Sequence, residues 1–528
     1  MNQSILHSLV GNLLQVQINT TPMGIDERID AAFSPIATAW ESFILAGIPL
    51  GNGKYLPFVV LLLVSGAAFF TIYFAFINIR RFPLAIQVVS GKYDHVEKGL
   101  PADTKPEDMQ HEEGEVSHFQ ALATAVSGTV GLGNIAGVAV AVGLGGPGAT
   151  FWMIVCGLIG MSSKFVECTL GVKYRDIDAQ GVVYGGPMYY LKKGLGEMGY
   201  VTFGKILGIL FAVLCVGASF GGGNAFQANQ ATQQIISMFQ LEGGGVKTVI
   251  GLVLAGIVAI VIIGGIKRIA QITEKIVPFM AILYIGASLI IIGFHYDFID
   301  DAFGMIFTQA FTPQAGMGGM IGVLIVGFQR AAFSNEAGAG SAAIAHSAVK
   351  TQYPASEGIV ALLEPFIDTV VICTMTALVI IMFNSDNMFT YGGVGGQVVL
   401  TNGQQVGGVD LTAMAFDSVI PHFSYVLTVA IILFAFSTMI SWSYYGLQAW
   451  KFLFGKGKAA DLTYKFIFLL FIVIGAAAKL DSVIRFSDAM ILALVFPNMV
   501  GLLFLFPTVK KELNKYLDAI QVPRFFKN

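Results

Sequence analysis

The residues best suited to bind a ligand lie in two apolar stretches that glycines and polar side chains interrupt. Residues 127–148 read SGTVGLGNIAGVAVAVGLGGPG, with a single asparagine at Asn134. Residues 327–347 read GFQRAAFSNEAGAGSAAIAHS. Glycine weakens a helix interior, and both stretches are otherwise apolar enough to lie in a bilayer. The composition therefore predicts two membrane helices that are broken near their middle.

A broken helix inside a membrane offers its backbone to a ligand. Unpaired backbone groups in hydrocarbon cost several kcal/mol each, so a break survives only where protein or a water-filled cavity satisfies them. The first half-helix ends in carbonyls with partial negative charge, and the second begins with N–H groups with partial positive charge. One site can then hold a cation and a carboxylate together. Glycines at Gly128, Gly131 and Gly133 would let the chain unwind and let a ligand approach the backbone.

The first break has the groups that recognise a zwitterionic amino acid. Such a ligand needs N–H donors for its carboxylate and carbonyl or amide acceptors for its ammonium group. We expect the carboxylate at the backbone N–H groups of residues 131–133. Asn134 is either a ligand or the residue that holds the unwound loop in place, and the ligand role is favoured.

Three further segments are expected to line the same pocket: the second break at residues 329–335, residues 220–227, and the segment around Trp442. Phe220, Asn224 and Gln227 are spaced for one helix face, although a glycine-permitted helix crossing would give the same pattern. Trp442 either closes the pocket or anchors its helix at the membrane interface. The candidate substrate-binding residues are Thr129, Gly131, Leu132, Gly133, Asn134, Phe220, Asn224, Gln227, Gln329, Phe333, Ser334, Asn335 and Trp442.

The predicted pocket is small and carries little charge. Walls of glycine backbone and bulky apolar side chains leave room only for a small side chain, so alanine or glycine fits. Arg330 and Glu336 are the charged residues at the breaks, and we expect them to pair with each other or with loop charges. Four more ionisable residues lie within the predicted spans, namely Lys164, Glu167, Glu364 and Asp368. They form gate and scaffold ion pairs or carry protons, and the ion-pair role is favoured.

Membrane-spanning helices must position these residues. Apolar windows of about 20 residues recur about eleven times, far too long for barrel strands. The predicted spans cover residues 55–77, 118–142, 150–172, 203–227, 246–266, 269–294, 317–346, 357–383, 425–450, 464–478 and 486–506.

The two broken spans are the second and the seventh. Because they are five spans apart, they cross the bilayer in opposite directions, which predicts an inverted repeat of five spans preceded by one helix. The predicted division is an external segment (1–54), a first helix with a cytoplasmic loop (55–117), two repeats (118–294 and 317–507) and a cytoplasmic tail (508–528).

Basic residues predict the orientation. About 23 Lys and Arg lie in the loops on the side of Arg80 and Lys510, against about 5 on the opposite side, so the N-terminus is expected outside and the C-terminus in the cytoplasm. In the outer loop of residues 384–422, Asn402-Gly403 between apolar runs predicts a hairpin.

Bulk composition excludes several functions. The 528 residues are 55% hydrophobic and 12% charged, which is typical of membrane proteins and indicates no nucleic-acid partner. The four cysteines lie inside apolar runs, the seven histidines lie at span ends and loops, and no phosphate-binding loop is present. An intramembrane enzyme is disfavoured, and a passive channel remains as an alternative.

Three blocks identify a family resemblance. SGTVGLGNIAGVA, GGPGATFWMIVCGLIGMSSKFVE and FSNEAGAGSAAIAHSAVKT resemble the signature blocks of the alanine or glycine:cation symporter family. Departures are small and occur at Gly128, Leu132 and Ala339. The family resembles the amino acid-polyamine-cation superfamily. The resemblance implies an all-α protein of about eleven transmembrane helices with the five-plus-five inverted repeat of the LeuT-type fold.

The resemblance also implies a sodium site. The run of residues 130–134 is similar to the first-core-helix motif of neurotransmitter:sodium symporters. Carried over, it places the carbonyls of Ser127 and Val130 and the hydroxyls of Ser437 and Thr438 around one sodium ion. Hard cations prefer oxygen ligands, which these groups supply. The alternative is that both hydroxyls bond back to their own helix.

The predicted protein is thus a secondary active transporter in a cell membrane of the bacterial inner-membrane type. It imports a small neutral amino acid, alanine or possibly glycine, of L or D form, with sodium by alternating access. The alternatives are sodium- or proton-coupled uptake of a larger neutral amino acid such as glutamine, or a passive amino-acid channel. The sequence does not define an oligomeric state.

Overall fold

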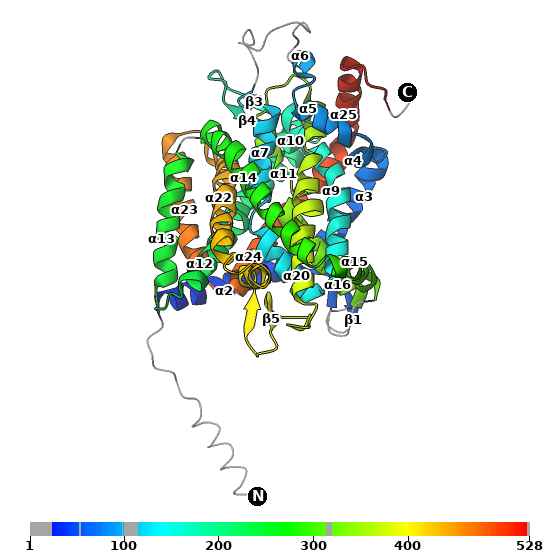
Figure 1. Ribbon diagram of the computed structural model, residues 1–528. Coiled ribbons are helices and arrows are strands. Elements are labelled where there is room, and N and C mark those ends of the chain that lie inside the picture. The colour runs from blue at the N-terminus through cyan, green and yellow to red at the C-terminus, as the bar shows by residue number, and fades with distance from the viewer. Residues whose placement is uncertain are drawn as a thin grey trace, which may run out of the picture.

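Long apolar helices make up most of the chain in the computed structural model (Figure 1). The structure describes residues 24–51, 54–97, 99, 114–263, 265–312 and 319–524. Parts of the predicted external segment, cytoplasmic loop and tail, namely residues 1–23, 100–113 and 525–528, lie outside the described residues. Within the described part, seven helices are long and apolar enough to cross a membrane, and one bent pair adds an eighth candidate.

Each of the eleven predicted spans contains helix. The spans with one continuous helix are α3 (Phe58–Tyr73), α9 (Gly148–Lys173), α13 (Val246–Ile262), α14 (Gly265–Phe294), α22 (Ser424–Phe454) and α23 (Lys458–Ala477). The last predicted span is covered by two successive helices, α24 (Leu480–Ala493) and α25 (Val495–Ala519). The outer helices expose large apolar side chains such as Leu252 and Ile260 of α13, while Lys164 of α9 is fully buried. This inverted distribution is typical of a bundle surrounded by lipid.

The two predicted breaks are confirmed. In the second span, α7 (His118–Thr129) and α8 (Val138–Gly145) are joined through the π-helical turn η2 (Gly133–Gly137), and the helix axis bends by 50°. In the seventh span, α16 (Gly319–Asn335) ends before a non-helical segment, and α17 (Ala343–His346) follows. Positive φ angles at Glu336, Gly338 and Gly340 turn the chain within that segment.

Two further spans contain π-helical turns that the sequence analysis did not predict. The fourth span consists of α11 (Val201–Phe220), η3 (Gly221–Ala225) and α12 (Phe226–Phe239). The eighth consists of α18 (Pro354–Val360), α19 (Leu363–Pro365), η5 (Phe366–Cys373) and α20 (Thr374–Phe383). Such turns often mark functional sites, because they widen the helix and rotate the residues that follow.

Shorter elements cover the two ends of the bundle (Figure 1). One end carries α2 (Ile25–Ile44), the hairpin of β1 (Gly47–Gly51) and β2 (Lys54–Pro57), and the hairpin of β5 (Gln397–Val399) and β6 (Gln405–Gly407) followed by α21 (Val409–Asp417). The opposite end carries α6 (Asp94–Glu97), and β3 (Asp176–Ile177) paired with β4 (Val183–Tyr184). The β5–β6 hairpin confirms the turn predicted at Asn402-Gly403.

The remaining helices are connectors beside the spans. They are α4 (Ile77–Arg80), α5 (Phe82–Val89), α10 (Pro187–Glu197), the 3-10 turn η4 (Tyr296–Phe298) and α15 (Ile299–Phe311).

Candidate functional site

The two broken helices meet at the carboxylate of Asp368. Asn134 of η2 donates from Nδ2 to Asp368 Oδ1 at 2.7 Å and to the Asp368 backbone oxygen at 3.0 Å. Ser334, near the end of α16, donates from Oγ to the same Oδ1 at 3.1 Å. All three residues are buried. The structure therefore joins one residue from each break through one acidic side chain on η5.

Asn134 also holds its own loop together. Its Oδ1 accepts from the backbone N–H of Gly131 at 3.0 Å, and its backbone oxygen accepts from Thr376 Oγ1 at 2.7 Å. The loop-holding role, left open by the sequence, is thus present. A direct role of Asn134 in ligand binding stays a prediction.

Gln227 connects the first break to the π-helical turn of the fourth span. Its Oε1 accepts from the backbone N–H of Leu132 at 3.0 Å, and its Nε2 donates to the carbonyl of Gly222 at 2.9 Å. The N–H groups of Gly131 and Leu132, predicted to receive a substrate carboxylate, are therefore bound to amide oxygens of Asn134 and Gln227. A carboxylate oxygen can replace an amide oxygen at either group without loss of a hydrogen bond.

The predicted cation ligands are brought together between α7 and α22. Thr438 donates from Oγ1 to the carbonyl of Ser127 at 3.0 Å, and Ser127 Oγ donates to the carbonyl of Ser437 at 2.8 Å. Ser437 Oγ donates to the carbonyl of Phe434 on its own helix at 3.0 Å, as the alternative interpretation expected. Ser441, which the sequence analysis missed, donates to Ser127 Oγ at 3.0 Å. Val130 follows α7 directly and begins the unwound segment.

Gly128 and Gly131 of the first break allow neighbouring side chains to approach the backbone closely. They are needed for this space and not for a left-handed backbone conformation. An ideal Cβ at Gly131 would lie 2.3 Å from Thr438 Oγ1 and 3.1 Å from Gln227 Oε1. At Gly128 it would lie 2.9 Å from the Tyr445 hydroxyl oxygen. Positive φ angles occur at neither position. The cation ligands and the first break could not be this close with any larger residue at Gly131.

Phe220 and Asn224 do not point toward the break, contrary to the predicted shared face. Phe220 stacks on Phe471 of α23 with ring centroids 4.6 Å apart, and Asn224 Nδ2 donates to the carbonyl of Phe468, also on α23, at 2.6 Å. The reason is η3, whose wider turn rotates Gln227 away from the face that a regular helix would give it. Phe220 and Asn224 therefore fit the alternative interpretation, in which the glycines permit a close helix crossing.

Aromatic side chains pack on the glycine backbone as expected. Phe333 lies 3.4 Å from an ideal Cβ at Gly133 and 3.0 Å from one at Gly222. Trp442 occupies the space beside Gly223, is 1% exposed, and donates from Nε1 to Glu336 Oε1 at 3.0 Å. Its burial excludes the interfacial-anchor alternative.

The remaining predicted residues lie around this centre. Thr129 Oγ1 donates to the carbonyl of Ala125 on its own helix at 3.2 Å. Asn335 Nδ2 donates to Thr369 Oγ1 at 2.8 Å, beside Asp368. Gln329 is half-buried on α16, one turn before Phe333.

The expected pairing of Arg330 and Glu336 with each other or with loop charges is wrong. Arg330 forms an ion pair with Asp488 of α24, and its guanidinium carbon lies 5.4 Å from the Phe333 ring centroid. Glu336 instead accepts from Trp442 Nε1 and Ser341 Oγ. Arg330 therefore binds α16 to α24, and Glu336 orients the tryptophan.

Asp368 does not form the gate or scaffold ion pair that the sequence analysis favoured for it, whereas Lys164 and Glu364 do pair. Its Oδ1 accepts from Asn134 and Ser334, and its Oδ2 accepts from Thr369 Oγ1 at 2.7 Å. Within the part of the chain that the structure describes, no Lys or Arg forms an ion pair with it. A buried carboxylate without a cationic side chain is a natural partner for a cation or an ammonium group.

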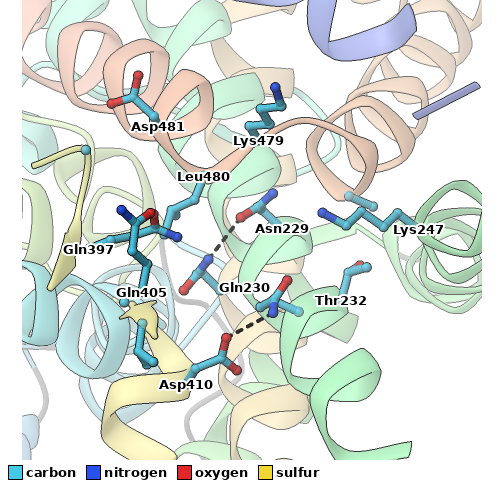
Figure 2. A pocket seen from close by; sticks show the side chains of 15 residues that line it. Asn229, Gln230, Thr232, Lys247, Gln397, Gln405, Asp410, Lys479, Leu480 and Asp481 are labelled. Carbon is cyan, nitrogen blue, oxygen red and sulfur yellow. Dashed lines mark hydrogen bonds between the residues drawn. The ribbon is translucent and has the colours of Figure 1, made fainter. Parts of the chain in front are cut away.

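A polar cavity of about 330 Å³ opens near the β5–β6 hairpin (Figure 2). Asn229 and Gln230 of α12 line it together with Lys247, Asp410 and Lys479. Burial raises the pKa of the Asp410 carboxyl, and hydrogen bonds from Ser237 and Gln233 act in the opposite direction. The cavity lies at the end of the bundle predicted to be external.

The broken helices, the shared polar centre and the apolar exterior define a multi-span membrane transporter with the LeuT-type fold. A solved structure of MhsT in complex with L-phenylalanine covers 76% of this chain and 100% of its own with a TM-score of 0.51, at 15% sequence identity. Residues 48–524 match the sodium:alanine symporter family, and the chain belongs to that family. It is therefore a sodium-coupled amino acid symporter by family, not an enzyme.

Two relatives show the range of the family. The sodium/alanine symporter AgcS of Methanococcus maripaludis is 40% identical over 87% of this chain and 94% of its own length. The "Probable sodium/glutamine symporter GlnT" of Bacillus subtilis is 33% identical over 89% of this chain and 90% of its own. The names of its relatives thus include two substrates of different size.

Proposed function

We propose that this chain imports a small neutral amino acid, alanine first, together with sodium. The observation that carries the proposal is the meeting of both helix breaks at Asp368, beside the contact between Thr438 and Ser127. The substrate carboxylate binds the N–H groups of Gly131 and Leu132, and its ammonium group faces the Asp368 carboxylate. Phe333 and Trp442 limit the side chain to a small one.

The transport direction follows from the proposed orientation. The end with α2 and the β5–β6 hairpin faces the exterior, and the end with α6 faces the cytoplasm. Residues 118–294 and 317–507 act as the two inverted repeats, which rock around the shared centre. Alternating access then exposes the substrate first to the polar external cavity (Figure 2).

Uptake of labelled alanine into proteoliposomes tests the function. We expect accumulation above equilibrium with an inward sodium gradient and none with potassium or a pH gradient alone. Unlabelled glutamine should compete poorly with alanine, because the pocket is walled by Phe333 and Trp442. Equilibration without accumulation would instead identify a facilitator or channel, and strong competition by glutamine would contradict the small pocket.

Thr438→Ala should weaken sodium coupling. The change removes the hydroxyl that contacts the Ser127 carbonyl, and we expect the sodium concentration for half-maximal uptake to rise about tenfold, since hydrogen bonds and ligands to charged groups contribute about 1.5–3 kcal/mol. Thr438→Ser should retain near-normal sodium dependence. Ser443→Ala is the matched control on the same helix, because among the described residues that hydroxyl bonds only to the carbonyl of Ile440. Equal sodium dependence in Thr438→Ala and Ser443→Ala would contradict this site.

A further inference from the structure

A chain of buried acidic and basic side chains runs from the α6 end of the bundle into its interior. None of its members has a side chain more than 7% exposed. They come from six different helices, in the order Glu97 (α6), His118 (α7), Glu357 (α18), His346 (α17), Glu364 (α19) and Lys164 (α9). The transport site described above uses none of them.

Each link in this chain is a direct contact. His118 Nε2 lies 2.5 Å from Glu97 Oε2, and its Nδ1 contacts Glu357 Oε2. His346 Nδ1 lies 2.5 Å from Glu357 Oε1, and its Nε2 lies 3.4 Å from Glu364 Oε2. Lys164 Nζ lies 3.0 Å from Glu364 Oε1. Glu357 is therefore held between the two imidazole rings.

The hydrogen-bonding pattern indicates the number of protons. Both nitrogens of each ring face a carboxylate oxygen, but a neutral imidazole has only one N–H and an ionised carboxylate has none. Each ring therefore needs one extra proton, either on the imidazole or on an adjoining carboxyl. With two such protons the six groups sum to zero charge. Without them Lys164 alone would oppose three buried carboxylates, which is costly.

The surrounding groups do not replace these protons. At the outer end, Tyr516 and Thr351 donate hydroxyls to Glu97 at 2.6 and 3.0 Å. Glu97 and His118 line a cavity of about 210 Å³, and the other charged residues there are Asp94, Glu115 and Lys350. At the inner end, the acids near Lys164 are Glu167 and Glu336, with Cys168 beside them. Arg175 is a further basic group near the outer end, where it donates to the carbonyls of Ser347 at 2.9 Å and Thr351 at 3.1 Å. Acidic side chains still outnumber lysine and arginine at both ends.

We propose that this chain is a binding site for two protons, loaded through the cavity at Glu97 and His118. The protons fasten the start of α7 to α17 and α18. Because α7 ends at the first break, the site controls movement of the helix that carries Ser127. Loss of the protons leaves Glu97, Glu357 and Glu364 repelling one another and releases α7.

Proton occupancy can be counted without any transport assay. Protein labelled with ¹⁵N-histidine is studied by NMR at about pH 8.5, where an ordinary histidine of pKa about 6.5 is neutral. Infrared spectra at the same pH detect protonated carboxyl groups. We expect two protons in total. If the rings carry them, NMR shows imidazolium signals, and His118→Gln and His346→Gln each remove one. If carboxyl groups carry them, infrared spectra show their bands, and Glu357→Gln alters those bands. Neutral rings with no protonated carboxyl would overturn the proposal.

The movement of α7 has its own test, also independent of substrate. Ala121 on α7 is fully buried, so a maleimide should reach Ala121→Cys only when α7 moves. As the pH is raised, its labelling should become several-fold faster relative to that of Ala139→Cys on α8, which corrects for thiol ionisation. In the Glu357→Gln background, where only one proton is needed and one carboxylate fewer is left to repel the others, the increase of labelling with pH should be smaller. Parallel labelling of both cysteines at every pH would contradict the proposal, whether or not the protein transports alanine.

Discussion

Replacing Asp368 with asparagine is expected to reduce alanine uptake about hundredfold or more. Asp368 is a fully buried acid that accepts from Asn134, Ser334 and Thr369. The substitution removes the negative charge opposite the cation or ammonium group. It also places an amide NH₂ either at the Oδ1 position, against the donors Asn134 and Ser334, or at the Oδ2 position, against Thr369. Each buried donor left unsatisfied costs about 1–3 kcal/mol. The measurement is initial uptake in proteoliposomes at saturating sodium.

A fall in uptake must be separated from a fall in folding. Asp417→Asn is the matched control, because that carboxylate accepts from the backbone N–H of Ser424 and an asparagine oxygen can still do so. We expect Asp417→Asn to retain uptake within about threefold, since exposed or partly exposed changes rarely exceed ~0.5 kcal/mol. Gel filtration and thermal unfolding report on folding of both variants. Normal uptake by a folded Asp368→Asn protein would exclude the carboxylate from ligand binding.

The fold could be predicted where the signal is local in the sequence. Long apolar windows specify the spans, and glycine with polar residues inside an apolar run specifies the two breaks. Helix α2 was missed because residues 1–54 were interpreted only as an external segment. It buries Phe33, Ala37 and Ile44, whose spacing is helical, although Pro35 interrupts the pattern. The π-helical turns η3 and η5 were missed because they depend on a shift in backbone hydrogen bonding that residue types do not specify.

The site could be predicted only in part, because its pairings depend on tertiary contacts. Ser127 and Thr438 were placed together through the family resemblance. Regular helical spacing predicted that Phe220, Asn224 and Gln227 share one face. The prediction is wrong because the π-helical turn η3 rotates Gln227 away from the other two residues. Likewise Glu364 and Asp368 are one helical turn apart in the sequence. In the structure Glu364 pairs with Lys164, whereas Asp368 turns toward Asn134 through η5.

Gly131→Ala should be the most damaging glycine-to-alanine substitution in the first break. Its Cβ would lie 2.3 Å from Thr438 Oγ1 and 3.1 Å from Gln227 Oε1, so α22 or the unwound segment must move. Overpacking typically costs about 1–3 kcal/mol. Here the displaced atoms are a proposed sodium ligand and the amide that holds the N–H of Leu132. We expect sodium-dependent uptake to fall about hundredfold, which corresponds to ~2.7 kcal/mol.

The control for Gly131→Ala lies in the same segment. Within the part of the chain that the structure describes, an ideal Cβ at Gly137 would meet only the Leu132 carbonyl oxygen, at 4.0 Å. Alanine also favours helix over glycine by about 0.5–1 kcal/mol. Gly137→Ala should therefore keep uptake and slightly raise thermal stability. Sodium should raise the unfolding temperature of wild-type protein and Gly137→Ala but not of Gly131→Ala, because a ligand stabilises only the state that binds it. If sodium stabilised all three equally, the ion would bind elsewhere, and the close approach at Gly131 would serve only packing.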